Sequence, residues 1–325
     1  MRTSKLLSAL VVACAAAWTI PAGALNIALT NDDGWSAPGI QALKAALRAA
    51  GHTVTLAAPL SDQSGGSMAW DQGVSLLVTK RGDGEYSVAI WNFPEISAKP
   101  ATTAPIAISI AEENGSPADL LISGINTSAN IGLAALQSGT VGAAIYAAMS
   151  PLNGPVPAVA VGTDAPACAP VPSCQIPHYQ DVANFIVRFV AHLQTKPGFL
   201  AREKGLLPTG VALIVSYPGP TPTGSEVKGI KVAVQSDGVM ANGMRVSGAY
   251  YCASSSTALT PCSDLVNVGD TQRVRMFLSP DSTPEIKDSD LGYFTDRYVT
   301  IVPIVPDLTA GNPLVFKSIL PGLVP

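Results

Sequence analysis

Histidine and net positive charge are both scarce in this sequence, and each shortage excludes a class of function. The chain of 325 residues holds 3 histidines, His52, His178 and His192, without regular ligand spacing, which excludes a zinc hydrolase site built on clustered histidines. We expect all three to be structural or solvent-facing. Lys plus Arg number 19 against 23 Asp plus Glu, and without a basic excess the chain is not built to bind a nucleic-acid polymer.

The sequence also lacks an apolar run long enough to span a membrane. The run over residues 6–20 falls short of the roughly 18 apolar residues that a spanning helix needs. Two basic residues precede this run, and the small residues Ala22–Ala24 follow it, which is the order of a secretory signal peptide. We therefore expect residues 1–24 to be removed and the chain to be exported, either to a periplasm or into the medium. The alternative is a lipoprotein anchored at Cys14.

Cysteine is sparse and falls in two close pairs once the N-terminal segment is removed. Cys168 lies near Cys174, and Cys252 lies near Cys262. An even number of cysteines in an exported chain favours disulfides, and proximity favours the pairings 168 to 174 and 252 to 262. Unpaired surface cysteines are the alternative.

The remaining composition, 47% hydrophobic and 13% charged, is that of a globular chain with a large core. An apolar strand at 25–29, an amphipathic helix between Pro38 and Gly51, and a second strand at 53–58 form a βαβ unit, which predicts a parallel sheet covered on both faces. The alternation continues with helices at 102–113, 139–149 and 179–196 and with strands at 119–122, 156–161, 211–215 and 298–302.

The expected fold class is therefore α/β, with a Rossmann-like, doubly wound and mostly parallel sheet in one domain over residues 25–325. Between about 225 and 285 the pattern changes to short strands at 230–234, 244–246 and 273–277. We interpret this stretch as a β-rich extension made of hairpin strands, and a separate second domain is the alternative.

Two adjacent carboxylates, Asp32 and Asp33, follow the first strand in the turn Asn31–Gly34. An ordinary polar turn would explain them in isolation. In an open α/β sheet, however, the carboxyl ends of the strands form the ligand crevice. Neighbouring carboxylates repel each other unless they are solvated or share a cation, so this position favours a divalent metal.

Two further loops carry polar residues to the same predicted edge. Asp62–Ser67, with Ser64, follows the second strand, and Ser123–Asn126 follows the strand at 119–122. A flexible loop and a plain turn are the simpler explanations of each. Their convergence beside Asp32 offers only oxygen ligands, which favours one Mg²⁺ or Mn²⁺ ion, or else Ca²⁺.

Ser138, Gly139 and Thr140 open the helix at 139–149, where free backbone N–H groups and the helix dipole favour an anion. An ordinary N-cap at Ser138 is the alternative. An anion pocket beside a metal site indicates phosphate ester chemistry.

Four separated motifs resemble the SurE-type nucleotidase and acid phosphatase family, in the family's order and at its spacing. They are TNDDGWSAPGIQAL (Thr30–Leu43), APLSDQSGGS (Ala58–Ser67), SGINTSANIG (Ser123–Gly132) and SGTVGAA (Ser138–Ala144). The resemblance implies a divalent-metal phosphomonoesterase acting on nucleoside monophosphates, and a dimer or tetramer held by swapped C-terminal elements.

The resemblance also implies roles for individual residues. It places metal ligands at Asp32, Asp33, Ser64 and Asn126. Our own hypothesis is that the aspartate pair is catalytic, with one of the two accepting the proton of an attacking water or, alternatively, attacking phosphorus directly. It places phosphate-binding residues at Ser138, Gly139 and Thr140, with Asn130 nearby.

This chain departs from the family pattern at positions that bear on the substrate. Ser128 replaces the usual Gly, Gln137 replaces a frequent Tyr, and Ile214–Pro218 lacks the usual Asn. Broader phosphate monoesters are therefore expected beside nucleotides. Two alternatives stay open, namely an exported protein that binds nucleotides without hydrolysis and a polyphosphatase using the same site.

Overall fold

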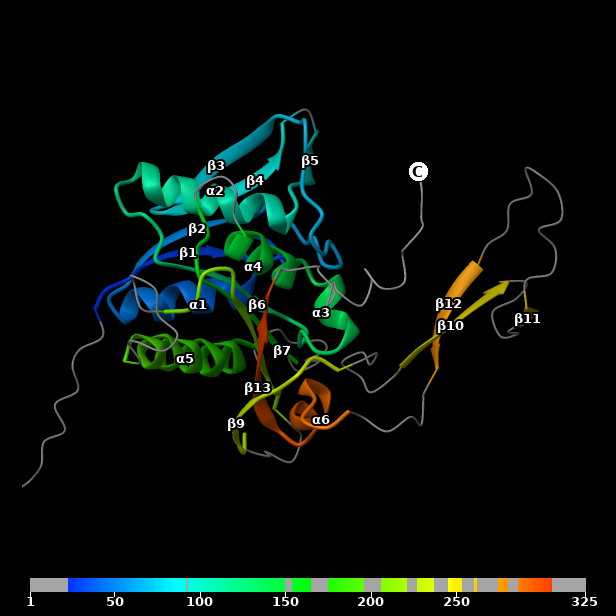
Figure 1. Cartoon of the computed structure of the whole chain (residues 1–325). Coiled ribbons are helices and arrows are strands. Elements are labelled where there is room, and N and C mark those ends of the chain that lie inside the picture. Colours follow the sequence, from blue (N-terminus) through cyan, green and yellow to red (C-terminus); the bar gives the residue numbers. More distant parts are fainter. Residues whose placement is uncertain are drawn as a thin grey trace, which may run out of the picture.

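A ten-stranded sheet with helices on both faces forms the body of the protein in a computed structural model (Figure 1). The structure describes residues 23–91, 93–149, 154–164, 175–195, 206–220, 227–236, 245–252, 260–261, 274–279 and 286–305. The N-terminal elements are β1 (Asn26–Thr30), α1 (Pro38–Ala49), β2 (Thr53–Pro59), β3 (Leu76–Gly82), β4 (Glu85–Ile90), β5 (Phe93–Ser97), α2 (Pro100–Glu113) and β6 (Leu120–Asn126). There follow α3 (Leu133–Gln137), α4 (Gly139–Met149), β7 (Ala158–Thr163), α5 (Gln175–Gln194), β8 (Ala212–Tyr217), β9 (Gly229–Val232), β10 (Arg245–Cys252), β11 (Thr260–Pro261), β12 (Val274–Ser279), α6 (Asp290–Thr295) and β13 (Tyr298–Ile304).

The strand order confirms a mostly parallel, doubly wound sheet. It runs β3-β4-β2-β1-β6-β7-β8-β13-β9, and β5 pairs with β4. The six consecutive strands β4-β2-β1-β6-β7-β8 are parallel to one another, while β3 is antiparallel to β4 and β13 is antiparallel to β8. Since the chain moves outward from β1 in both directions, the crevice of such a sheet lies where the order reverses, beside β1.

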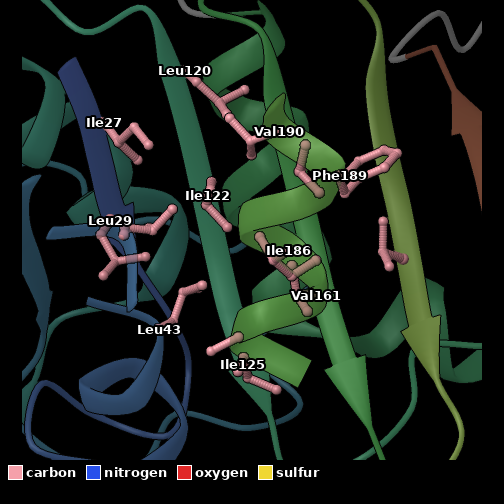
Figure 2. Packing of buried hydrophobic residues seen from close by; sticks show 14 of the residues in the cluster. Ile27, Leu29, Leu43, Leu120, Ile122, Ile125, Val161, Ile186, Phe189 and Val190 are labelled. Carbon is pink, nitrogen blue, oxygen red and sulfur yellow. The ribbon is translucent and has the colours of Figure 1, made fainter. Parts of the chain in front are cut away.

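Apolar side chains from both faces of the sheet make two buried clusters. On one face, α1 packs Ile40, Leu43 and Leu47 against the strands, because these residues recur at helical spacing. Figure 2 shows α5 laying Ile186 and Val190 over β6 and β7 in the same cluster. The other face is covered by α2 and α4, which contribute mostly alanines.

Several predicted boundaries differ from the observed ones. The strand predicted at 119–122 extends to Asn126 as β6, and all of it is buried, so Ser123–Asn126 are part of a strand and not of a loop. The helix predicted at 179–196 begins one turn earlier, at Gln175.

The prediction that strand 230–234 belongs to a hairpin in the β-rich extension was wrong. Its counterpart β9 pairs in parallel with β13 and forms an edge of the main sheet. The strands β10, β11 and β12 do form a separate antiparallel three-stranded sheet, which Figure 1 shows apart from the ten-stranded one.

The strands β3, β4 and β5 were not predicted at all. A signal for the first two exists, because Asp83–Gly84 stands between two β-rich runs and such a dipeptide favours a tight hairpin.

The predicted histidine roles agree with the contacts of two of these side chains. The Leu25 N–H donates to His52 Nδ1 over 3.1 Å, and His178 Nε2 lies 2.6 Å from the Thr163 hydroxyl. In the described ranges, none of the helices combines the length and apolar character needed to cross a bilayer.

Several predictions fall outside the described residues. They concern most of the signal segment 1–24, including Cys14, and the cysteines Cys168, Cys174 and Cys262. Cys252 ends β10, where the backbone alone is described. The signal peptide, the export route, the disulfides and the oligomeric state therefore stay predictions.

Candidate active site

Three of the predicted motifs leave the sheet at the same edge because their strands are neighbours. β1 lies between β2 and β6, with Leu29 opposite Leu56 on one side and Thr30 opposite Ser123 on the other. The loops that follow these strands therefore start side by side. The sequence predicted that these three loops meet at one edge of the sheet, and the structure has this arrangement.

Asp32 is buried, with 1% of its surface exposed, and Thr140 at the start of α4 holds its carboxylate. The Thr140 N–H donates to Asp32 Oδ2 over 3.1 Å, and the Thr140 hydroxyl donates to Oδ1. Burial raises the pKa of Asp32, and the two bonds from Thr140 oppose that rise. The ionised carboxylate is therefore stabilised by its contacts but pays a desolvation cost.

Asp33 is half-buried and is held by Thr127, just beyond β6. The Thr127 hydroxyl donates to Asp33 Oδ1 over 3.1 Å, and its N–H donates to Oδ2 over 3.3 Å. Burial, and then the neighbouring charge of Asp32, raise the pKa of Asp33 to about 7. Two carboxylates that repel each other in this way form a place where a cation lowers the free energy.

Ser64 and Asn126 each contact one further polar side chain. The Ser64 hydroxyl and N–H donate to Asp62 Oδ1 over 2.7 and 2.8 Å. The Asn126 Nδ2 group donates to Asn130 Oδ1 over 3.0 Å. This bond fixes which end of the Asn126 amide is the donor, so that its Oδ1 atom remains an acceptor.

A cavity of about 170 Å³ lies at this edge and collects most of the predicted residues. Its lining consists of Asp32, Ser64, Gly65, Asn126, Thr127, Ser128, Ala129, Asn130, Ala134, Gln137 and Ser138. Asp33 is not among the lining residues, but its partner Thr127 is. Gly139 and Thr140 are also absent from the lining.

The first turn of α4 differs from the expected open anion pocket. The Val141 N–H donates to the Ser138 hydroxyl over 3.2 Å, which is the N-cap contact that stood as the alternative. The Thr140 N–H is used by Asp32. The N–H of Thr140, one of the residues expected to bind phosphate, is thus occupied within the protein, as is the N–H of the next residue, Val141.

Two residues that touch predicted ligands received no role from the sequence, namely Thr127 and Asp62. Thr127 directly follows Asn126, and Asp62 lies two residues before Ser64. That proximity was the available signal. It could not show that the Thr127 side chain reaches Asp33, which lies 94 positions away.

The loop carrying Ser64 rests on α3 and α4 at a point where only glycine fits. A Cβ atom at Gly142 would lie 1.9 Å from the Ser67 carbonyl oxygen. The Ser67 N–H donates to the Gln137 carbonyl over 3.1 Å and its hydroxyl donates to the Leu136 carbonyl over 2.8 Å. These contacts hold the loop that carries Ser64 and Ser67 directly against α3 and α4.

Replacing Gly142 by Ala is therefore expected to destabilise the protein, although Ala in place of Gly normally stabilises a helix interior by about 1 kcal/mol. The clash with Ser67 should lower the free energy of unfolding by roughly 1–3 kcal/mol, as overpacking does. Denaturant unfolding monitored by circular dichroism measures this change. A more stable Gly142→Ala variant would show that the loop does not lie against α4.

The donors at this edge have the chemistry of a hard divalent cation site. Asp32, Asp33, Ser64 and Asn126 offer carboxylate, hydroxyl and amide oxygens, which suit Mg²⁺, Mn²⁺ or Ca²⁺. The buried and mutually repelling aspartate pair supplies the negative charge. Over the described residues, no three His, Cys, Asp or Glu side chains gather into a metal site.

A larger hollow of about 500 Å³ lies elsewhere, around Arg48, His52 and Lys80. It sits near the start of β2 and the turn between β3 and β4, which includes Asp83. Size alone would favour it as a ligand site, but none of the predicted ligands lines it. The smaller cavity, which Asp32 lines and Asp33 adjoins through Thr127, is therefore the candidate site.

Comparison with known proteins agrees with the motifs. The family model described as Survival protein SurE matches residues 27–242. The chain is 32% identical over 213 residues to a 5'-nucleotidase SurE from Syntrophobacter fumaroxidans, a match covering 65% of this chain and 72% of that protein. It is 39% identical over 143 residues to a 5'-nucleotidase SurE from Desulfovibrio desulfuricans, a match covering 43% of this chain and 50% of the relative.

A solved structure supports the fold independently. The crystal structure of the SurE protein from Aquifex aeolicus superposes with a TM-score of 0.66, covering 91% of this chain and 98% of that one. The sequence identity is 23%, so the likeness concerns the fold.

Proposed function

Because the chain belongs to the SurE family, we propose that it is a divalent-metal-dependent phosphomonoesterase that hydrolyses nucleoside monophosphates and broader phosphate monoesters. The observation that carries this proposal is the meeting of Asp32, Ser64 and Asn126 in one cavity, with Asp33 directly beside it. The relatives named 5'-nucleotidase SurE support the same class of reaction.

Asp32, Asp33, Ser64 and Asn126 are the residues that would hold the cation, which is Mg²⁺ or Mn²⁺, with Ca²⁺ as the alternative. When bound, such a cation supplies positive charge that polarises a phosphoryl oxygen and acidifies water. The chain's own contribution is to keep both carboxylates fixed, through Thr140 and Thr127. A fixed arrangement lowers the reorganisation needed during the reaction.

Asn130 is suited to contact the phosphoryl group. It lines the cavity and is 1% exposed, and its Nδ2 atom has no hydrogen-bond partner in the described part of the chain. A buried amide donor without a partner is costly, and an anionic oxygen of the substrate would satisfy it. Ser138 also lines the cavity, where its hydroxyl can donate to the same group.

Asp33 is better placed than Asp32 to accept a proton from the attacking water. Both carboxylates accept two bonds from a threonine, but Asp33 is half-buried and so within reach of solvent, whereas Asp32 is buried. We assign Asp33 the role of general base and Asp32 that of a cation ligand only.

The size of the cavity favours a broad range of monoesters. At about 170 Å³ it is smaller than the roughly 300–1,000 Å³ of pockets that enclose a whole ligand. It suits the phosphoryl end of a substrate, and the rest of the ester would then lie outside it. Ser128 and Gln137, which differ from the family pattern, line the same cavity. The leaving group of the ester would pass beside these two side chains.

A substrate panel tests this function against its alternatives. With Mn²⁺ present, we expect release of inorganic phosphate from AMP and from p-nitrophenyl phosphate at rates within about tenfold of each other, because recognition is centred on the phosphoryl group. Binding of AMP by calorimetry without any phosphate release would indicate a binding protein instead. Cleavage of polyphosphate alone would identify a polyphosphatase.

A further inference from the structure

Each aspartate of the pair is held by a single threonine through the same two bonds. Thr140 donates its N–H to one oxygen of Asp32 and its hydroxyl to the other. Thr127 does the same to Asp33. The two threonines come from different elements, since Thr140 lies in the first turn of α4 and Thr127 directly follows β6.

We propose that Thr140 is a positioning residue that fixes the Asp32 carboxylate for cation binding, and that Thr127 is its weaker counterpart at Asp33. This inference rests on the proposed function and concerns the same site. It assigns Thr140 a different task from the phosphate binding implied by the family resemblance.

The hydrogen bonds that Thr140 makes support a positioning role in place of phosphate binding. A threonine residue has one backbone N–H and one hydroxyl proton to donate, and at Thr140 both go to Asp32. Thr140 is fully buried, at 0% exposure, and does not line the cavity. It therefore has no proton left to donate to a phosphoryl oxygen.

The start of α4 is shaped so that Asp32 can come close. A Cβ atom at Gly139 would lie 3.0 Å from Asp32 Cβ and 2.8 Å from Pro100 Cγ, so only glycine leaves room for the aspartate there. The partial positive charge at a helix N-terminus stabilises a carboxylate, and α4 begins at Gly139. The helix therefore serves as an anchor for Asp32, which offsets part of the cost of burying its charge.

The consequence for the cation follows from ligand geometry. Hydrogen bonds to both oxygens prevent the carboxylate from rotating. Its remaining lone pairs therefore stay directed at the position of the cation. Residues that hold metal ligands in this way typically change metal affinity by about 10- to 100-fold when they are removed. Thr127 is exposed, so water can replace its bonds to Asp33 and its removal should matter less.

The test compares Thr140→Val, Thr140→Ser and Thr127→Val with the wild-type protein. Titration calorimetry with Mn²⁺ on the metal-free proteins gives the dissociation constant of the cation without any turnover. We expect Thr140→Val, which keeps the shape but loses the hydroxyl, to raise this constant at least tenfold. Thr140→Ser keeps the hydroxyl and should stay within about threefold of wild type, and Thr127→Val should fall between the two.

Thr102→Val is the matched control for the loss of a buried threonine hydroxyl. Thr102 is also buried, and its hydroxyl donates over 2.9 Å to Oδ2 of Asp71, an aspartate that does not line the cavity. Its replacement should leave the Mn²⁺ dissociation constant unchanged. If Thr140→Val does not fold, the comparison of Thr140→Ala with Thr140→Ser replaces it, because this pair also differs by the hydroxyl.

Steady-state kinetics separate positioning from phosphate binding. At saturating Mn²⁺, Thr140→Val should keep the KM for p-nitrophenyl phosphate. An unchanged Mn²⁺ constant together with a raised KM would overturn the proposal and make Thr140 a phosphate-binding residue. Wild-type protein that binds Mn²⁺ but releases no phosphate would refute the proposed function while leaving the positioning role measurable by calorimetry.

Discussion

The substitution Asp32→Asn is expected to lower kcat/KM for phosphate release by roughly 10³-fold or more, which corresponds to about 4 kcal/mol of lost transition-state stabilisation. It removes one negative charge from the cation site. It also places an amide where Thr140 presents an N–H and a hydroxyl donor. The NH₂ group of the new amide would then meet one of these two donors, and two donors repel each other. The asparagine side chain would therefore carry no charge and would also rotate away from the position of the carboxylate.

The fold should survive this change, because neutralising a buried carboxylate removes a desolvation cost. The melting temperature of metal-free Asp32→Asn should stay within a few degrees of wild type. Asp83→Asn is the matched control, because it makes the same charge change at an exposed turn beside the other hollow and should retain full activity. An Asp32→Asn variant as active as Asp83→Asn would remove Asp32 from the catalytic site.

Removal of divalent cations with EDTA is expected to abolish hydrolysis, leaving less than about 1% of the activity, with recovery on adding Mn²⁺ or Mg²⁺. The physical reason is the charge of the site. Two neighbouring carboxylates remain at the cavity without the cation, and they repel the phosphate dianion. Activity that persists through exhaustive chelation would show that the aspartates act without a metal.

The stability of the metal-free protein should respond to pH through Asp33. Burial and the charge of Asp32 raise its pKa from an ordinary value of 3.8 to about 7, so the folded state binds this proton more tightly than the unfolded state does. The folded state therefore loses stability as pH rises from about 4 to 7, and a bound cation reverses this loss.

Thermal melting at pH 5 and pH 8 measures this effect. The metal-free Asp33→Asn variant should be less sensitive to this change in pH than wild type, by several degrees, at roughly 2–4 °C for each kcal/mol. Equal sensitivity of the two proteins would mean that Asp33 is ionised without cost in the metal-free fold.

The sequence was sufficient to predict which loops meet, because that depends on local patterns. The apolar run before Asp32 and the helical spacing of Ile40, Leu43 and Leu47 are local signals. Together they predict a βαβ unit, and the edge of a parallel sheet then places the loops after β1, β2 and β6 side by side.

Contacts between distant residues were beyond such patterns. Nothing in the first turn of α4 shows that Thr140 reaches Asp32, 108 positions earlier. The pairing of β9 with β13 likewise joins one segment that precedes the three-stranded sheet in the sequence and another that follows it. The sequence of a short strand such as Gly229–Val232 does not indicate which strand it will pair with. Packing in the folded chain determines that pairing.

The position of a bound cation is the most direct test of a shared metal and phosphoryl site at the end of β1. A crystal of the protein soaked in Mn²⁺ should give an anomalous peak among the oxygens of Asp32, Asp33, Ser64 and Asn126, at roughly 2.0–2.2 Å from each ligand. A peak elsewhere, with none beside this aspartate pair in a soaked and active crystal, would contradict the assignment of the site.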